Sequence, residues 1–170
     1  MFFMKCRLKN DTFWYRYIYP KNLTLFANEK LVAPEISLGG NFSYDLNGQY
    51  YSTTKVYGYI KKSEVEESYF FWLGLFNSQL FWYFIQQTGY VLRGGYFTFK
   101  TNYILPFPIP KTLPVEIVNE IEKLVKDILL KKSSLEKNET LAQEKMINNF
   151  IYQLYDLSVE DINTIEINKE

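Results

Sequence analysis

Short runs rich in aromatic and β-branched residues, each bounded by turn formers, recur through the first two thirds of the chain. Runs of this length and composition predict β-strands. We expect strands at residues 14–19, 30–36, 55–60 and 96–100. A hairpin is also expected, because residues 42–45 and 49–52 flank Leu46-Asn47-Gly48, whose Asn-Gly pair tolerates positive φ.

Two longer apolar windows between the strands predict helices at residues 66–76 and 78–88, with Asn77 or Ser78 placed to cap the second one. Together they contain the most apolar part of the chain, residues 69–85. Gly74 and the polar residues 77–79 interrupt it, whereas a membrane span needs about 20 predominantly apolar residues. We therefore expect two buried core helices and no membrane span.

The pattern changes after the proline-rich stretch at residues 106–110, since prolines resist helix and hold the chain extended. Apolar residues from Val115 to Ile128 recur at three- and four-residue spacing, which predicts an amphipathic helix. A second helix is expected from about Leu135 to Leu154. Ser158, followed three residues later by Asp161, resembles a capping box for a short last helix.

These elements predict a mixed α/β (α+β) fold with two parts. Residues 1–110 form a body made of a small twisted β-sheet and two core helices, and residues 111–170 form a C-terminal helical hairpin. Composition supports this division, because 29 of the 32 aromatic residues precede residue 111. The net charge of zero also divides, into +4 for residues 1–110 (11 Lys/Arg, 7 Asp/Glu) and −4 for the tail (8 and 12).

The residues required by several enzyme classes are missing. The chain has no histidine and Cys6 is its only cysteine, which excludes Cys/His zinc sites, an internal disulfide and imidazole catalysis. The glycine pairs lack the spacing of a nucleotide-binding loop. Glu64, Glu66 and Glu67 precede an apolar helix and are expected to face its N-terminus, and Glu120 to Lys123 lie in an amphipathic helix. We expect no catalytic residue, metal or cofactor, and the composition agrees with a reducing cytoplasm.

With these enzyme classes excluded, the function that the sequence still supports is binding through a surface. Phosphate contacts come from Lys and Arg, and base contacts from Arg, Lys, Asn, Gln, Ser and Thr, and the loops of the body are rich in these types. The candidate DNA-contacting residues are Ser37, Asn41, Thr53, Thr54, Lys55, Arg93, Tyr96, Lys100 and Asn102. Arg93 is the foremost among them, because the glycines that follow it leave room for close approach. The rings of Trp14, Phe42, Trp72 and Trp82 are expected in the core.

Composition alone leaves three binding functions open. Duplex DNA recognition predicts salt-sensitive binding to duplexes. Single-strand binding by aromatic stacking predicts a preference for single strands. A protein–protein interaction module, in which exposed aromatics and the helical hairpin dock a partner, predicts salt-independent association with a protein and no retardation of DNA.

The order of several motifs narrows this choice. Trp14-Tyr15-Arg16-Tyr17 is followed by residues 30–37, then by Phe42-Ser43-Tyr44-Asp45, by Leu73 to Leu80 with Asn77-Ser78-Gln79 at their centre, and finally by Pro106-Phe107-Pro108-Ile109-Pro110. This succession resembles the TaqI-like C-terminal specificity domain of adenine-specific DNA methyltransferases and type IIG restriction–modification enzymes. The similarity covers residues 13–166, including a family-like tail at Leu154 to Ile162. Target-recognition domains of type I specificity subunits are the nearest relatives that could be confused with it.

The resemblance implies a non-catalytic domain that recognises duplex DNA through the major groove. A separate adenine methyltransferase catalytic domain or subunit would flip the target base. The catalytic motif and the S-adenosylmethionine glycine motif of that domain are absent from this chain. We therefore expect an excised domain or a truncated reading frame. Recognition residues vary within such families, so the resemblance assigns no individual contact.

Overall fold

The computed structural model describes residues 24–51, 55–133 and 139–167. Within these ranges the chain folds into two small antiparallel sheets and a set of helices, so the predicted mixed α/β class is confirmed. The predicted strand at residues 14–19 lies outside the described residues, as do Cys6, Trp14, Thr53 and Thr54.

The larger sheet has β1 (Lys30–Pro34) at its centre, between β3 (Ser43–Asp45) and β4 (Val56–Tyr59), and both pairings are antiparallel. The smaller sheet is a ribbon of two strands, β2 (Ile36–Ser37) and β5 (Phe97–Thr98). The predicted strands at residues 55–60 and 96–100 are thus present in shortened form.

The single strand predicted at residues 30–36 is wrong, because the chain changes sheets at Glu35. Pro34 has no N–H for a continued ladder. The backbone N–H of Glu35 donates to the carbonyl of Lys55 (2.8 Å), and the carbonyl of Glu35 accepts from the N–H of Phe99 (2.7 Å). The strand therefore ends its pairing with β4 and starts a new one with β5.

The predicted hairpin between residues 42–45 and 49–52 is also wrong. β3 forms, but it pairs with β1, with Lys30 opposite Asp45. The Asp45 carboxylate accepts the backbone N–H groups of Gln49 (2.9 Å) and Tyr50 (3.0 Å), donors that a returning strand would have used in its ladder. Gly48 makes the turn with a φ of 59°, as the Asn-Gly pattern predicted.

The most apolar segment forms two helices, α1 (Tyr69–Phe76) and α2 (Gln79–Thr88), as expected. α1 begins three residues later than predicted, because the Ser68 hydroxyl accepts hydrogen bonds from the N–H groups of Phe70 and Phe71. The acidic residues expected at its N-terminus therefore lie before its first turn. Ser78 caps α2 through the N–H of Phe81 (3.1 Å), as predicted. In the described ranges, none of the helices has both the length and the apolar character of a membrane-crossing segment.

A short helix that the sequence did not predict, α3 (Thr101–Ile104), follows β5. The tail then forms α4 (Val115–Ser133), α5 (Leu141–Leu154) and α6 (Val159–Ile167). α5 begins at Leu141 and not near Leu135 as predicted. Thr140 is its N-cap: the Thr140 carbonyl accepts from the N–H of Glu144 (2.9 Å), and the Thr140 hydroxyl donates to the Glu144 side chain (2.8 Å). The capping box is confirmed: the Ser158 N–H donates to the Asp161 carboxylate (3.0 Å), and the Asp161 N–H donates to the Ser158 hydroxyl (3.2 Å).

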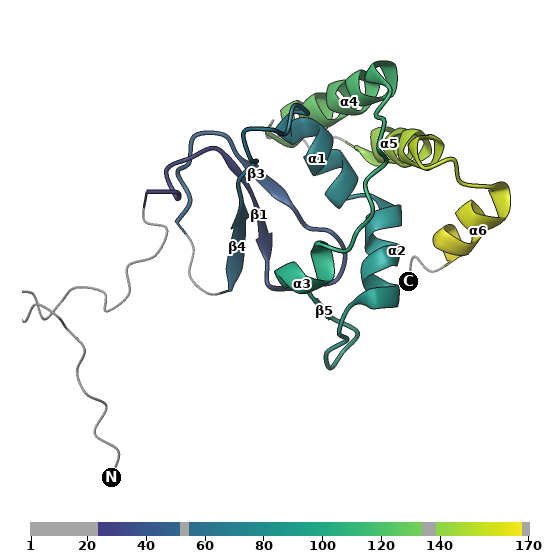
Figure 1. Ribbon diagram of the computed structural model, residues 1–170, viewed down its shortest axis with the longest axis horizontal. Coiled ribbons are helices and arrows are strands. Elements are labelled where there is room, and N and C mark those ends of the chain that lie inside the picture. Colours follow the sequence, from purple (N-terminus) through teal and green to yellow (C-terminus); the bar gives the residue numbers. More distant parts are fainter. Residues whose placement is uncertain (1–23, 52–54, 134–138, 168–170) are drawn as a thin grey trace, which may run out of the picture.

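The elements stack in layers. α1 lies between the larger sheet and the packed pair α4 and α5, and α6 lies beside α2 (Figure 1). One hydrophobic core joins aromatic residues of the body to aliphatic residues of the tail. The proline-rich stretch packs against both parts: the Phe107 ring contacts Phe81 and Tyr155 (centroids 5.0 and 5.8 Å apart), and the Tyr155 hydroxyl donates to the carbonyl of Pro108 (2.8 Å).

Candidate nucleic-acid interface

The β2–β5 ribbon brings together loops that are distant in the sequence. Ile36 lies opposite Thr98 and Ser37 opposite Phe97, in antiparallel register. The loop that follows Ser37 therefore lies at the same end of the ribbon as the loop that precedes Phe97. This pairing gathers four candidate DNA-contacting residues, Ser37, Asn41, Arg93 and Tyr96, at one end.

Arg93 lies at the tip of a hairpin that precedes β5. The N–H of Gly95 donates to the carbonyl of Leu92 (3.2 Å), and the N–H of Leu92 donates to the carbonyl of Tyr96 (2.6 Å). Gly94 has a φ of 85°, the value that the third position of a type II turn requires. Arg93 and Tyr96 are both exposed. Figure 1 shows this loop projecting beyond α2 and β5, so it can reach into a groove.

The second loop at this end, residues 37–42, is held by its own side chains. Asn41 has a φ of 51°, and its Nδ2 donates to the hydroxyl of Ser37 and to the carbonyl of Leu38 (3.1 Å). Ser37 is buried whereas Asn41 is exposed. In this arrangement Ser37 fixes the loop from inside, and Asn41 and Leu38 form its outer surface.

The opposite end of the ribbon holds Lys55, Lys100 and Asn102. The backbone of Lys55 is joined to Glu35, which itself bonds Phe99, the residue before Lys100. All three candidates are exposed, and Asn102 lies in α3. Strands rise about 3.3 Å per residue, so the two ends of the ribbon lie within the span of one major groove, which is about 12 Å wide.

One carboxylate lies among these cations. The Lys55 ammonium is 3.5 Å from the Glu35 carboxylate, with the Lys55 side chain 77% exposed, so the pair is a weak one that phosphate can displace. Burial first, and then the nearby Glu35 carboxylate, raise the pKa of Tyr57, which stays a neutral phenol at physiological pH. Charge at this end is therefore set by Lys55, Lys100 and Glu35.

Apolar side chains surround the ribbon on its exposed surface. Ile36, Leu38, Tyr90, Val91 and Tyr96 are each between 42% and 60% exposed. Val91 is bridged to Phe97, so it belongs to the same hairpin as Arg93. Apolar groups beside a cation suit base edges in the major groove, where the thymine methyl group is an apolar contact.

Of the four aromatic residues expected in the core, the three that lie in the described ranges, Phe42, Trp72 and Trp82, are found in or against it. Phe42 is 5% exposed, and Trp72 and Trp82 are partly buried against the hydrophobic core. Trp82 stacks on Phe99 with centroids 6.3 Å apart. Trp82 also packs on Phe97 of β5 (centroids 5.4 Å apart), so this ring supports the ribbon.

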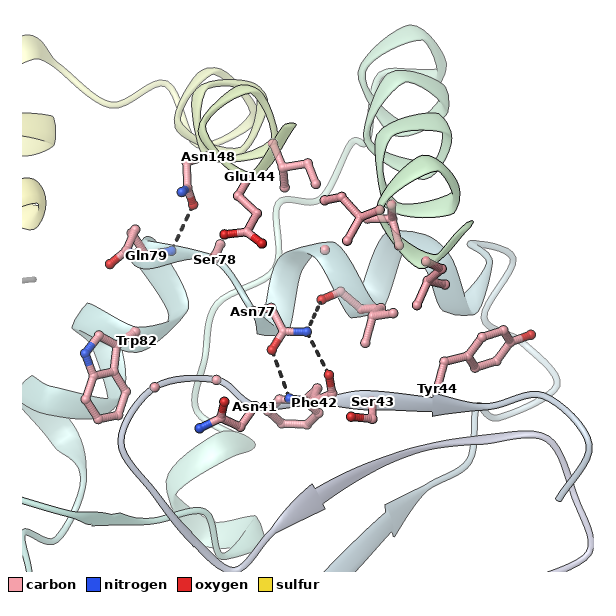
Figure 2. A pocket seen from close by; sticks show the side chains of 18 of the residues that line it. Asn41, Phe42, Ser43, Tyr44, Asn77, Ser78, Gln79, Trp82, Glu144 and Asn148 are labelled. Carbon is pink, nitrogen blue, oxygen red and sulfur yellow. Dashed lines mark hydrogen bonds between the residues drawn. The ribbon is translucent and has the colours of Figure 1, made fainter. Parts of the chain in front are cut away.

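A cavity of about 690 Å³ opens on the other side of the 37–42 loop, between that loop, the junction of α1 with α2, and the helices α4 and α5. Figure 2 shows the Asn77 carboxamide bridging to the backbone of Phe42, and Asn148 of α5 reaching the backbone of Gln79. The sequence indicated Asn77 as a candidate cap, as part of the polar interruption at residues 77–79 and as part of the family-like motif, but it predicted no contact with Phe42 and did not indicate Asn148. Both bonds join residues far apart in the sequence, so no local pattern could have found them.

Metal ligands were not expected, and the structure of residues 24–51, 55–133 and 139–167 places no three His, Cys, Asp or Glu side chains together as a candidate metal site. Glu64 and Glu66 are exposed and Glu67 is partly exposed. In the second segment Ile121 is buried in the core, while the carboxylates of Glu120 and Glu122 are partly exposed and form ion pairs with Lys123 (3.8 Å) and Lys126 (3.6 Å).

Comparison with protein families matches residues 3–109 to the model described as the TaqI-like C-terminal specificity domain. The chain belongs to this family. Specificity domains of this kind have a role in DNA recognition within methyltransferases. The match includes the ribbon, the Arg93 hairpin and the Asn77-Ser78-Gln79 junction, and it ends within the proline-rich stretch. Family-like features of the tail stay a prediction. A search of curated proteins found no match.

Proposed function

We propose that this chain recognises a specific sequence in duplex DNA as the target-recognition domain of an adenine methyltransferase in a restriction–modification system, with no catalysis of its own. The observation that carries the proposal is the pairing of β2 with β5, which brings the loops of Arg93, Tyr96 and Asn41 to one end of the ribbon and the exposed cations Lys55 and Lys100 to the other. A separate catalytic domain or subunit would bind S-adenosylmethionine and modify the base, and the cytoplasm is the expected compartment.

Residues in this surface divide into two roles. Arg93 projects from a glycine-bearing turn, and an arginine there can pair with the two acceptors of a guanine edge in the major groove. Lys55 and Lys100 lie at the other end of the ribbon, where they would neutralise phosphates and so position the domain without reading sequence. Thr53 and Thr54 immediately precede Lys55 in the sequence and remain candidate contacts.

The proposal also assigns roles to the two parts of the chain. Residues 1–110 would form the recognition body and residues 111–170 the brace. The α4–α5 pair supports this division, because it covers the face of α1 that points away from the sheet (Figure 1). The acidic tail is then directed away from the phosphates.

The test begins with the full chain and a pool of random-sequence duplexes at low salt. Duplexes retained over successive rounds are sequenced, and affinities for a selected duplex and a scrambled duplex are compared over a range of salt concentrations. We expect one enriched motif and binding that weakens as salt rises. Failure to enrich a motif, or tighter binding of single strands, would overturn the proposal.

A charge-matched pair of variants then locates the surface. Arg93→Ala should weaken binding to the selected duplex by about tenfold and relax discrimination at one base pair, since one bidentate contact contributes about 1–3 kcal/mol. Lys145→Ala removes one exposed charge from α5 and should leave the discrimination unchanged. Equal effects of the two variants would place the DNA elsewhere on the protein.

A further inference from the structure

Asn77 makes an unusual set of bonds at the junction of α1 and α2. Its Oδ1 accepts from the N–H of Phe42 (2.9 Å), and its Nδ2 donates to the carbonyls of Phe42 (3.0 Å) and Leu73 (3.0 Å) (Figure 2). Both polar atoms of the carboxamide are thus bound to backbone. One side chain satisfies the donor and the acceptor of the same residue in another segment, 35 positions away.

The position of Phe42 determines that of the loop before it. Its ring is buried among aromatic residues, with centroids 5.0 Å from Phe76 and 5.9 Å from Phe81. Gly40 lies directly on the junction: a Cβ built there would be 2.4 Å from the carbonyl oxygen of Phe76 and 2.8 Å from the Cα of Asn77. The backbone of Gly40 therefore contacts the helix junction directly, and the backbone of Phe42 is joined to the same junction by the Asn77 carboxamide.

At its other end the same loop is fixed by the ribbon, where Ser37 pairs with Phe97. Between these two fixed points the chain has a φ of 99° at Gly39 and 51° at Asn41, and the Asn41 side chain bonds Ser37 and Leu38 within the loop. The loop is therefore a compact unit whose position is given by the ribbon at one end and by Phe42 at the other. Leu38 and Asn41 form its exposed surface. If the Phe42 anchor is lost, these side chains shift relative to Arg93 across the ribbon.

The geometry points to Asn77 as a positioning residue for DNA discrimination: it sets the conformation of the 37–42 loop without touching DNA. This inference rests on the proposed function of the loop as part of the recognition surface. It assigns a task to the polar interruption of the most apolar segment in the chain, a task distinct from the capping that Ser78 performs.

Asn77→Asp gives a test with its own internal control. At neutral pH the aspartate can accept from the Phe42 N–H but cannot donate, and it faces two carbonyl oxygens. These surroundings disfavour the charged form and raise the pKa of the new carboxyl above its usual value of about 3.9. Once protonated, the carboxyl again has one donor and one acceptor. The same polypeptide can therefore be switched between a poor and a good replacement for asparagine.

We expect Asn77→Asp at pH 8 to lose about tenfold in the ratio of affinities for the selected and the scrambled duplex, comparable to one base contact. The ratio should recover towards that of the wild type as the pH is lowered to about 5, whereas Asn77→Ala should show no recovery. Every ratio is normalised to the wild type at the same pH. A loss that does not depend on pH, or an unchanged ratio in a folded variant, would overturn the inference.

Asn148→Ala is the matched control. Its Oδ1 accepts from the N–H of Gln79 (2.9 Å), so the variant removes a bond from the same junction on the side away from the loop. It should lower stability and leave discrimination unchanged. An equal loss of discrimination in Asn148→Ala would mean that general weakening of the junction, and not anchoring of Phe42, is responsible.

Two readouts separate the remaining outcomes. Amide chemical shifts of residues 38–42 in the free protein should change in Asn77→Ala, while the shifts of the Arg93 hairpin should be the same as in the wild type. Unchanged shifts together with lost discrimination would show that Asn77 touches DNA directly, which overturns the positioning role. If the wild type itself selects no duplex, the proposed function fails; if it selects one and Asn77 variants discriminate normally, only the inference fails.

Discussion

The Lys30 ammonium and the Asp45 carboxylate form an ion pair inside the protein, with each side chain only 2% exposed. The ammonium also donates to the carbonyl of Phe26 (2.7 Å), and the carboxylate accepts the N–H groups of Gln49 and Tyr50. Lys30 and Asp45 lie opposite each other in β1 and β3, so this pair holds the turn that precedes β1 and the turn that follows β3.

We predict that Asp45→Asn lowers the free energy of unfolding by about 3–5 kcal/mol, because it leaves the Lys30 charge buried without its partner. Urea denaturation at pH 7 measures the change. Glu64→Gln is the control, since Glu64 belongs to the exposed Lys62–Glu64 pair (3.9 Å) and its loss should change stability by no more than about 1 kcal/mol. Similar values for the two variants would contradict the role assigned to the buried pair.

The same carboxylate predicts acid sensitivity. Burial by itself would raise the pKa of Asp45, but the hydrogen bonds from Lys30 and from the backbone of Tyr50 and Gln49 outweigh it, so the pKa lies below its usual value. A depressed pKa stabilises the folded state above the unfolded value of about 3.9, and this contribution is lost as the pH falls through the folded value.

The wild type should therefore lose stability as the pH drops below about 4, and Asp45→Asn should lose less over the same interval. Denaturant midpoints between neutral and acid pH measure this difference. Parallel curves for the two proteins would show that other groups control acid unfolding.

Gly74 lies where α1 packs against the tail helices. A Cβ at this position would be 2.8 Å from Cγ2 of Ile121 and 3.1 Å from Cγ2 of Val125, both buried. In an exposed helix Gly→Ala stabilises by about 0.5–1 kcal/mol. Here we predict a loss of about 1–3 kcal/mol, because the added methyl group overpacks the contact. The free energy of unfolding of the two proteins, measured with denaturant, tests this prediction. A Gly74→Ala variant that is more stable than the wild type would show that α4 can move aside without a loss of stability.

Lys55 is expected to contact phosphate and not a base. Lys55→Ala should reduce affinity for selected and scrambled duplexes by the same factor, and reduce the slope of log affinity against log salt by about one. Lys62→Ala is the control, because Lys62 is likewise exposed (81%) and paired with a carboxylate. A selective loss for the chosen sequence would instead make Lys55 a base contact.

The capping box of α6 predicts a local effect. Hydrogen bonds from the Ser158 hydroxyl and N–H lower the pKa of Asp161. Ser158→Ala should move that pKa back towards its ordinary value and speed amide exchange in α6 about fivefold, as expected for the loss of an N-cap. NMR titration of the Asp161 carboxyl measures the change in pKa, and NMR hydrogen exchange measures the change in the exchange rate of α6. Exchange in α4 should stay unchanged, and an unaffected α6 would show that packing of Ile165 alone holds the helix.

The sequence by itself determined the features that depend on near neighbours. Helical periodicity from Val115, the polar interruption at residues 77–79, the cap at Ser78 and the box at Ser158 all arise within a few residues, so their patterns remained visible in the chain. The order of motifs was enough to indicate the family. Mixed α/β character followed from the same local signals.

Tertiary structure decided the rest, because it depended on partners that no local pattern specifies. β3 pairs with β1 and not with the following segment, since the Asp45 carboxylate binds Lys30 and takes the donors a hairpin would need. β2 separates from β1 because Glu35 bonds Lys55 and Phe99. Asn77 and Asn148 act on backbone 35 and 69 positions away. The candidate surface exists only because these long-range hydrogen bonds place one loop beside another.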